Sequence, residues 1–113
     1  LYNKYEAIES LIIIESLGYI DFMCLQKNSK FVITDSGGVQ EESSFFMVPC
    51  LTIRENTERP ITIKEGTNTL VGTNYDDICT CITNVNFDTY SNIEYWDGKS
   101  SQRIVKVLER ELT

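Results

Sequence analysis

The chain has 113 residues, of which 42% are hydrophobic and 24% are charged. This size and composition describe one globular domain and exclude an intrinsically disordered protein. The net charge is −7, and the Lys and Arg residues are scattered without forming a basic block. We therefore expect neither nucleic acid nor an anionic membrane as a partner, although a single phosphate ligand needs only local donors.

The predicted elements of the first half alternate between apolar runs and helical patterns. Residues 2–10 are weakly helical, whereas the apolar run Leu11–Glu15 predicts a first buried strand. In Tyr19–Gln26 the apolar residues recur at helical spacing. A helix that begins at about Val39 is expected to turn Val39, Phe46 and Met47 inward. The predicted strands of this half are residues 11–15, 31–34 and 50–53, and the predicted helices are residues 19–26 and 39–46.

The second half continues the alternation. Pro60 is expected to open a short helix that stops at Gly66, and Thr69–Gly72 predicts a fourth strand. Asn74 is a good N-cap for a helix over residues 75–84, with Ile78, Ile82 and Val85 inward. Residues 87–96 are irregular, and Ser100 or Ser101 is expected to cap a last helix. The apolar stripe of that helix contains Ile104, Val105, Leu108 and Leu112.

This order of elements predicts an α/β fold in which a parallel sheet of about four strands is flanked by helices. No linker or repeat divides the chain, so residues 1–113 are expected to form one domain. No apolar run reaches the ~20 residues of a membrane span, and no signal peptide leads the chain, so we expect a cytoplasmic protein. Because the chain begins at Leu1 and not at Met, a fragment or a processed product is also expected.

The chain has four cysteines and no histidine. Cys79 and Cys81 form a C-x-C pair, unlike the C-x-x-C of redox and zinc sites. Buried, reduced thiols are therefore the preferred interpretation of Cys24, Cys50, Cys79 and Cys81. Because histidine is the commonest metal ligand and general acid or base, we expect no metal site.

The most informative stretch is the junction Asp35-Ser36-Gly37-Gly38 between a strand and a helix. Two glycines allow the backbone to turn with positive φ and to approach a ligand closely. The free N–H groups and the dipole of the next helix then favour an anion, most often phosphate, with Ser36, Gly37 and Gly38 as donors. An ordinary tight turn between strand and helix is the alternative.

Charged residues near the predicted carboxyl edge of the sheet allow two interpretations each. Glu42, like Glu41, is either a solvated residue of the first helical turn or an acceptor for vicinal sugar hydroxyls. Arg54 and Arg59 either form a surface ion-pair cluster or neutralise a pyrophosphate.

Tyr19 and Phe22 form a second candidate feature. Their helical spacing favours the core, but a place at the edge of the sheet would let either ring cover a nucleobase. The spacing alone does not separate these two alternatives.

Several of these segments together resemble the non-hydrolysing UDP-N-acetylglucosamine 2-epimerases. The resemblance covers about residues 17–108 and rests on an ordered series of motifs. These are Thr34-Asp-Ser-Gly-Gly-Val-Gln-Glu-Glu42, Pro49, Arg54-Glu-Asn-Thr-Glu-Arg-Pro60, Gly66-Thr67, Leu70-Val-Gly-Thr73 and Asp97-Gly-Lys-Ser-Ser-Gln-Arg-Ile104.

The resemblance implies part of the C-terminal domain of a two-domain, Rossmann-like enzyme of the GT-B type. Such enzymes interconvert UDP-N-acetylglucosamine and UDP-N-acetylmannosamine by eliminating and re-adding UDP, without a nicotinamide cofactor or a catalytic metal, and serve cell-surface polysaccharide biosynthesis. By position, Ser36, Gly37 and Gly38 would bind the diphosphate and Arg59 would steady it. Glu42 would hold the ribose hydroxyls, and Phe22 would lie by the uracil.

The chain departs from the family pattern in two ways. The catalytic carboxylates, an Arg and an essential His precede the matched segment, so no catalytic residue is expected within this chain. Met47 and Trp96 stand where the family usually has glycine. The alternatives are a free-standing UDP or UDP-sugar binding module that works with a partner half, a hydrolysing epimerase and a GT-B glycosyltransferase. The partners implied are UDP or UDP-N-acetylglucosamine, an N-terminal domain and, since the family commonly dimerises, a second copy.

Overall fold

The computed structural model describes residues 8–113. Its centre is a parallel sheet of three strands in the order β1-β2-β3, formed by β1 (Val32–Thr34), β2 (Cys50–Thr52) and β3 (Asn68–Leu70). Cys50 of β2 lies opposite Val32 on one side and Asn68 on the other. The predicted α/β class with a parallel sheet flanked by helices is therefore confirmed, with three strands in the described residues where about four were predicted.

The predicted strand Leu11–Glu15 is wrong. These residues have neither helical nor strand structure, and Ile12 is 82% exposed. A strand needs a neighbour that pairs with its N–H and C=O groups, and within residues 8–113 no strand pairs with this segment. Of the predicted helical stretch 2–10, residues 2–7 lie outside the described residues, and Glu9 and Ser10 form a turn.

The five helices of the described chain lie within two residues of their predicted positions. Asn74 caps α4 as expected, because its side chain accepts from the N–H groups of Asp76 and Asp77. Ser100 and Ser101 do not cap α5; Lys99 holds the N-cap position, and its N–H donates to Asp97 instead. The helices are α1 (Tyr19–Lys27), α2 (Gly37–Phe45), α3 (Pro60–Lys64), α4 (Tyr75–Thr83) and α5 (Ser100–Leu112).

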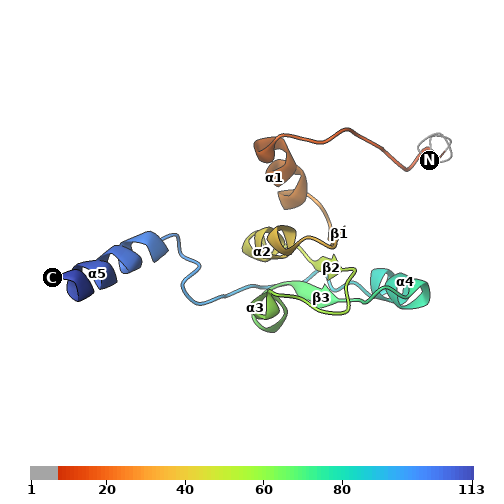
Figure 1. Cartoon of the computed structure of the whole chain (residues 1–113). Helices are drawn as coiled ribbons and strands as arrows, with labels where there is room; N and C mark the ends of the chain where they lie inside the picture. The colour runs from red at the N-terminus through yellow and green to blue at the C-terminus, as the bar shows by residue number, and fades with distance from the viewer. Residues whose placement is uncertain (1–7) are drawn as a thin grey trace.

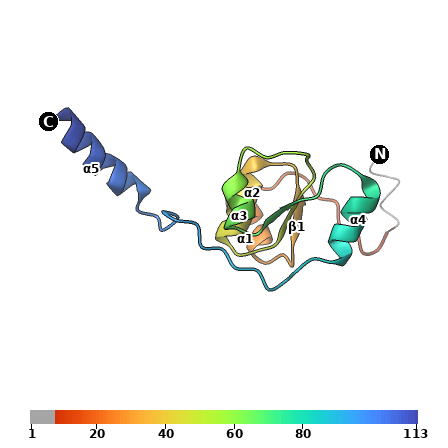
Figure 2. The same ribbon diagram turned by 90° about the horizontal axis from the view of Figure 1, so that it is seen from below.

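The sheet separates two groups of helices. Figures 1 and 2 show α2 and α3 on one side of the strands, α4 on the other, and α5 projecting away from the sheet. The predicted stripe of α5 faces solvent, since Ile104, Val105, Leu108 and Leu112 are each at least 50% exposed. No helix in residues 8–113 is long and apolar enough to cross a membrane.

The buried interior is partly polar. Its apolar members are Val48, Cys50, Leu51, Val71 and Ile93, whereas α2 buries Gln40, Ser43 and Ser44 against the sheet. The expectation that Met47 points inward is wrong, because this side chain is 47% exposed; Val39 and Phe46 are only half-buried. On α4, Ile78 is half-buried and Ile82 is 36% exposed.

The cysteines differ in exposure. All four are free, but only Cys50 is buried, and burial raises the pKa of its thiol. The prediction of buried thiols is wrong for Cys24, which is exposed, and holds only in part for Cys79 and Cys81.

Met47 ends α2 in a Schellman motif. Its N–H donates to Ser44 O and the N–H of Val48 donates to Ser43 O, at 3.2 and 2.9 Å. Met47 has a φ of +59°, so it occupies the left-handed position in which the family usually has glycine. Trp96 does not take a positive φ; Tyr95, the residue before it, has a φ of +69°.

Replacing Met47 by glycine should stabilise the protein. A left-handed conformation costs a side-chain-bearing residue about 1–2 kcal/mol, which exceeds the backbone entropy cost of glycine. We expect Met47→Gly to raise the free energy of unfolding by about 0.5–1 kcal/mol, measured by urea denaturation. As a control, Leu25→Gly should lower it by about 1 kcal/mol, because Leu25 is similarly exposed but lies inside α1. Equal changes in the free energy of unfolding of both variants would contradict the explanation that the left-handed backbone of Met47 favours glycine.

Candidate functional site

Three loops meet at the carboxyl edge of the sheet. They follow Thr34, Thr52 and Leu70, the last residues of β1, β2 and β3. The second and third loops are joined directly, because the N–H of Gly72 donates to Arg54 O and the hydroxyl of Thr73 donates to Glu55 Oε1 at 3.0 Å. Open α/β sheets bind ligands at this edge. The strand predicted at residues 11–15 would have placed Glu15–Tyr19 at this edge as well, but this segment follows no strand.

The first loop contains the Ser-Gly-Gly motif. Ser36 is the N-cap of α2, and its Oγ accepts from the N–H of Val39 at 3.5 Å. Gly37 and Gly38 are the first two residues of the helix, so their N–H groups have no partner within it. The expectation that these glycines turn with positive φ is wrong, since among the glycines of residues 8–113 only Gly72 and Gly98 have a positive φ.

The Glu58 side chain lies directly against Gly37. A Cβ at this position would collide with Oε1 of Glu58, and it would lie 3.9 Å from Nε of Arg59. Because the Glu58 side chain is 48% exposed, it would have to turn toward solvent to make room for a side chain there. Glu58 also pairs with Arg54 at 3.0 Å. Hydrogen bonding to its own backbone N–H, then the charges of Arg54 and Arg59, lower the pKa of the Glu58 carboxyl.

Arg59 and Arg54 have different environments. Nε of Arg59 lies 2.9 Å from Oε1 of Glu41, which places the guanidinium against the first turns of α2. Arg54 forms an i,i+4 pair with Glu58. For Arg54, the interpretation as a surface ion pair therefore agrees with the structure. For Arg59, the structure adds proximity to the Ser-Gly-Gly motif.

Glu42 is held by a residue of α1. Its Oε2 accepts from Nε2 of Gln26 at 2.6 Å, and Gln26 is 2% exposed. The other amide atom of this residue, Gln26 Oε1, is buried and has no hydrogen-bond partner among residues 8–113. Glu42 thus has a fixed carboxylate at the surface of α2 and is not a freely solvated residue.

Aromatic residues line two hollows beside α2. Phe22, which is 39% exposed, lines a pocket of about 180 Å³ together with Thr34 and Val39. Tyr19 and Trp96 line a shallower pocket of about 490 Å³ with Glu41 and Glu42. The interpretation of Tyr19 as a core residue is wrong, because it is 68% exposed. Phe22 therefore lies where it could contact the flat ring of a ligand bound next to the Ser-Gly-Gly motif.

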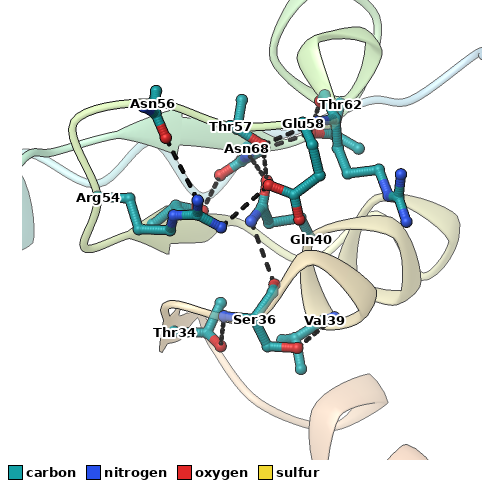
Figure 3. Close-up of polar contacts among 12 residues, drawn as sticks. Thr34, Ser36, Val39, Gln40, Arg54, Asn56, Thr57, Glu58, Thr62 and Asn68 are labelled. Carbon is teal, nitrogen blue, oxygen red and sulfur yellow. Dashed lines mark hydrogen bonds and ion pairs between the residues drawn. The ribbon is translucent and has the colours of Figure 1, made fainter.

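The loops rest on a buried polar network that the sequence analysis did not single out (Figure 3). Gln40 is fully buried and contacts Ser36, Thr57 and Asn68. A glutamine one turn after a helix N-cap gives no sequence signal that separates it from a solvated residue. Thr57 lies within the charged run Arg54–Arg59, and no sequence pattern distinguishes it from a solvated residue.

These features define a class of site. Free N–H groups at a helix start, a nearby guanidinium, a fixed carboxylate and an exposed aromatic ring suit a nucleotide better than a metal ion. Within residues 8–113, no three side chains of metal-ligating type come together. The fold belongs to the Rossmann-like α/β class, in which ligands bind at this edge of the sheet.

Comparison with known proteins identifies the family. The family model described as UDP-N-acetylglucosamine 2-epimerase matches residues 1–109, and the chain belongs to this family. The UDP-N-acetylglucosamine 2-epimerase of Methanocaldococcus jannaschii is 41% identical over 109 residues, which cover 96% of this chain. The chain spans about 30% of the length of that relative.

Solved structures show the same relationship. The structure of UDP-GlcNAc 2-epimerase from M. jannaschii matches with a TM-score of 0.81 at 40% identity, covering 96% of this chain and 31% of that one. A second structure of that enzyme, in complex with UDP-GlcNAc and UDP, matches with a TM-score of 0.79 at 39% identity and covers 96% and 30%. The predicted family and its Rossmann-like fold are thus confirmed.

The buried hydrogen bonds of Asn68 lead to a prediction about stability. Asn68 is 4% exposed, donates to Gln40 and Thr62, and accepts from Thr52 at 2.5 Å. Asn68→Leu would leave several buried polar groups unpaired, so it should lower the free energy of unfolding by about 2–4 kcal/mol in urea denaturation. Thr69→Val changes the exposed neighbour in the same strand and should cost less than about 0.5 kcal/mol. Similar losses in both variants would refute the importance of the network.

Proposed function

We propose that this chain supplies the UDP-binding part of a UDP-N-acetylglucosamine 2-epimerase. The membership of the family and the M. jannaschii homologue in complex with UDP-GlcNAc and UDP support the proposal. Such an enzyme interconverts UDP-N-acetylglucosamine and UDP-N-acetylmannosamine by eliminating and re-adding UDP. In this proposal residues 1–113 form one Rossmann-like unit of the C-terminal domain, and the acid and base groups belong to the remainder of the enzyme.

The diphosphate is proposed to bind at the start of α2. Ser36, Gly37 and Gly38 would donate their hydroxyl and N–H groups to it, and the helix dipole would favour its charge. The observation that carries the proposal is the position of Arg59, whose guanidinium lies against these same turns through its contact with Glu41. A planar guanidinium can exchange one carboxylate partner for a phosphate.

The nucleoside is proposed to lie between α1 and α2. Glu42, held by Gln26, would accept hydrogen bonds from the two ribose hydroxyls. Phe22, which lines the neighbouring pocket, would lie beside the uracil ring. These positions keep the carboxylate of Glu42 away from the diphosphate, which it would otherwise repel.

Binding would require one local rearrangement. The Glu58 carboxylate lies against Gly37, so a phosphate at the same helix start would displace it toward solvent. The side chain of Glu58 is already 48% exposed, and exposed ion pairs such as that with Arg54 contribute little free energy. Displacing the Glu58 side chain should therefore cost little free energy.

The proposed enzyme works in the cytoplasm, where nucleotide sugars are available, and uses no cofactor. A second copy of the chain is a proposed partner, and the N-terminal domain of the family's two-domain enzymes is another. We propose no role for the four cysteines in the reaction.

Calorimetric titration with UDP tests the proposal. We expect saturable binding by the purified chain, which Glu42→Ala and Arg59→Ala each weaken by about 1–3 kcal/mol, because each leaves a polar group of the ligand unpaired. The matched controls are Glu109→Ala and Arg110→Ala, which remove the same charges from α5. Absence of binding by a chain that circular dichroism shows to be folded would contradict UDP binding by this chain.

A second prediction concerns catalysis. We expect the purified 113-residue chain not to epimerise UDP-N-acetylglucosamine, since it has no histidine and spans about 30% of the length of its relative. Nuclear magnetic resonance of the sugar in deuterated water would detect turnover as exchange of the C2 proton. Exchange above the rate of a heat-denatured control would overturn this expectation.

A further inference from the structure

One buried side chain joins the two loops that form the proposed anion site. Gln40 is fully buried, and its Nε2 donates to the carbonyl oxygen of Ser36 at 3.2 Å. On the opposite side, its Oε1 accepts from the hydroxyl of Thr57 at 2.6 Å and from Nδ2 of Asn68 at 3.0 Å. Figure 3 shows Gln40 between Ser36 and Thr57. The Ser-Gly-Gly loop and the loop of residues 54–59 are thus held by one amide group.

Thr57 continues the connection to Arg59. Its hydroxyl oxygen accepts from the backbone N–H of Arg59 at 2.9 Å while its proton is donated to Gln40. A hydroxyl that donates to one partner and accepts from another fixes the relative position of both. The path from Ser36 to Arg59 therefore consists of three consecutive hydrogen bonds, through Gln40 and Thr57.

We propose that Thr57, through Gln40, is a positioning residue that holds Arg59 at the diphosphate side of the site. This inference rests on the proposed function. Within residues 8–113 the Arg59 side chain itself is held by an ion pair with Glu41 in which both side chains are about two-fifths exposed, and such pairs are weak. The backbone is anchored by Thr57 and by the hydroxyl of Thr62, which donates to Arg59 O at 2.7 Å. Thr57 contacts Gln40 directly, whereas Thr62 reaches Gln40 only through Asn68.

Thr57→Val tests the inference, because valine has the shape of threonine and lacks its hydroxyl. The fold should persist, since Gln40 Oε1 keeps Asn68 as a donor. We expect the affinity for UDP to fall by roughly two- to tenfold, the range of one lost hydrogen bond, whereas the affinity for uridine, which has no phosphate, stays unchanged. Thr57→Ser restores the hydroxyl and should bind UDP like the unmodified chain.

Thr67→Val is the matched control. Its hydroxyl is buried and donates to Val48 O at 2.6 Å, whereas Thr57 is half-buried, and Thr67 lies at the amino end of β3, at the opposite edge of the sheet. This variant loses a comparable hydrogen bond without touching the loops. If it reduces UDP binding as much as Thr57→Val does, or if Thr57→Val weakens uridine and UDP equally, general destabilisation explains the loss and the inference is wrong.

Hydrogen exchange of the Arg59 amide gives a readout that does not depend on any ligand. Thr57→Val should accelerate this exchange by roughly two- to tenfold, whereas Thr57→Ser and Thr67→Val should leave it unchanged. If the unmodified chain does not bind UDP, the proposed function fails for this chain, and the exchange rates alone decide whether Thr57 positions Arg59. Unchanged exchange in Thr57→Val would overturn the inference, whatever the result with UDP.

Discussion

The fold depends on hydrogen bonds between buried side chains of the sheet and of α2. Asn68 of β3 joins Thr52 of β2 to Gln40 of α2, and the apolar part of the interior is small. Hydrogen bonds are directional and are costly to leave unmade in a low dielectric. They therefore fix the rotation and height of α2 over the strands more narrowly than apolar contacts would. The start of α2, with its free N–H groups, is therefore held in a fixed position as well.

The same constraint explains why small residues face the sheet on α2. Ser43 and Ser44 are fully buried, and Ser44 Oγ accepts from the N–H of Thr67 at 3.2 Å. The helix ends immediately afterwards at Met47 in a left-handed conformation that suits glycine better. The chain thus holds a residue in an unfavourable conformation at the end of α2, while the other end carries the proposed site.

The sequence predicted the parts of the fold that depend on local signals. The Asn74 cap, the helix opened by Pro60 and the short apolar runs of β1 and β2 each follow from residues close in sequence. The prediction of a strand at Leu11–Glu15 was wrong because a strand requires a neighbouring strand to pair with, which composition does not reveal. The prediction that Met47 points inward was wrong because the face of α2 that meets the sheet is determined by hydrogen bonds to Asn68 and Thr57, which are distant in sequence. For the same reason the sequence did not predict a role for Gln40 and Thr57, whereas the motifs around Ser36, Gly37 and Arg59 made these three residues candidates.

The electrostatics of the site limit how it can recognise an anion. The chain carries a net charge of −7, and two carboxylates, those of Glu41 and Glu58, lie beside the start of α2. Long-range attraction therefore does not favour an anion at this place. Recognition must come from short-range donors whose positions are fixed before binding, since preorganised hydrogen bonds need no further ordering when the ligand arrives. Both carboxylates repel any anion, so an anion would need enough hydrogen-bonding oxygens to engage the backbone and Arg59 together and offset this repulsion. The proposed site would therefore select by geometry more than by charge, and the buried Gln40, which is hydrogen-bonded to both of its loops, would maintain that geometry.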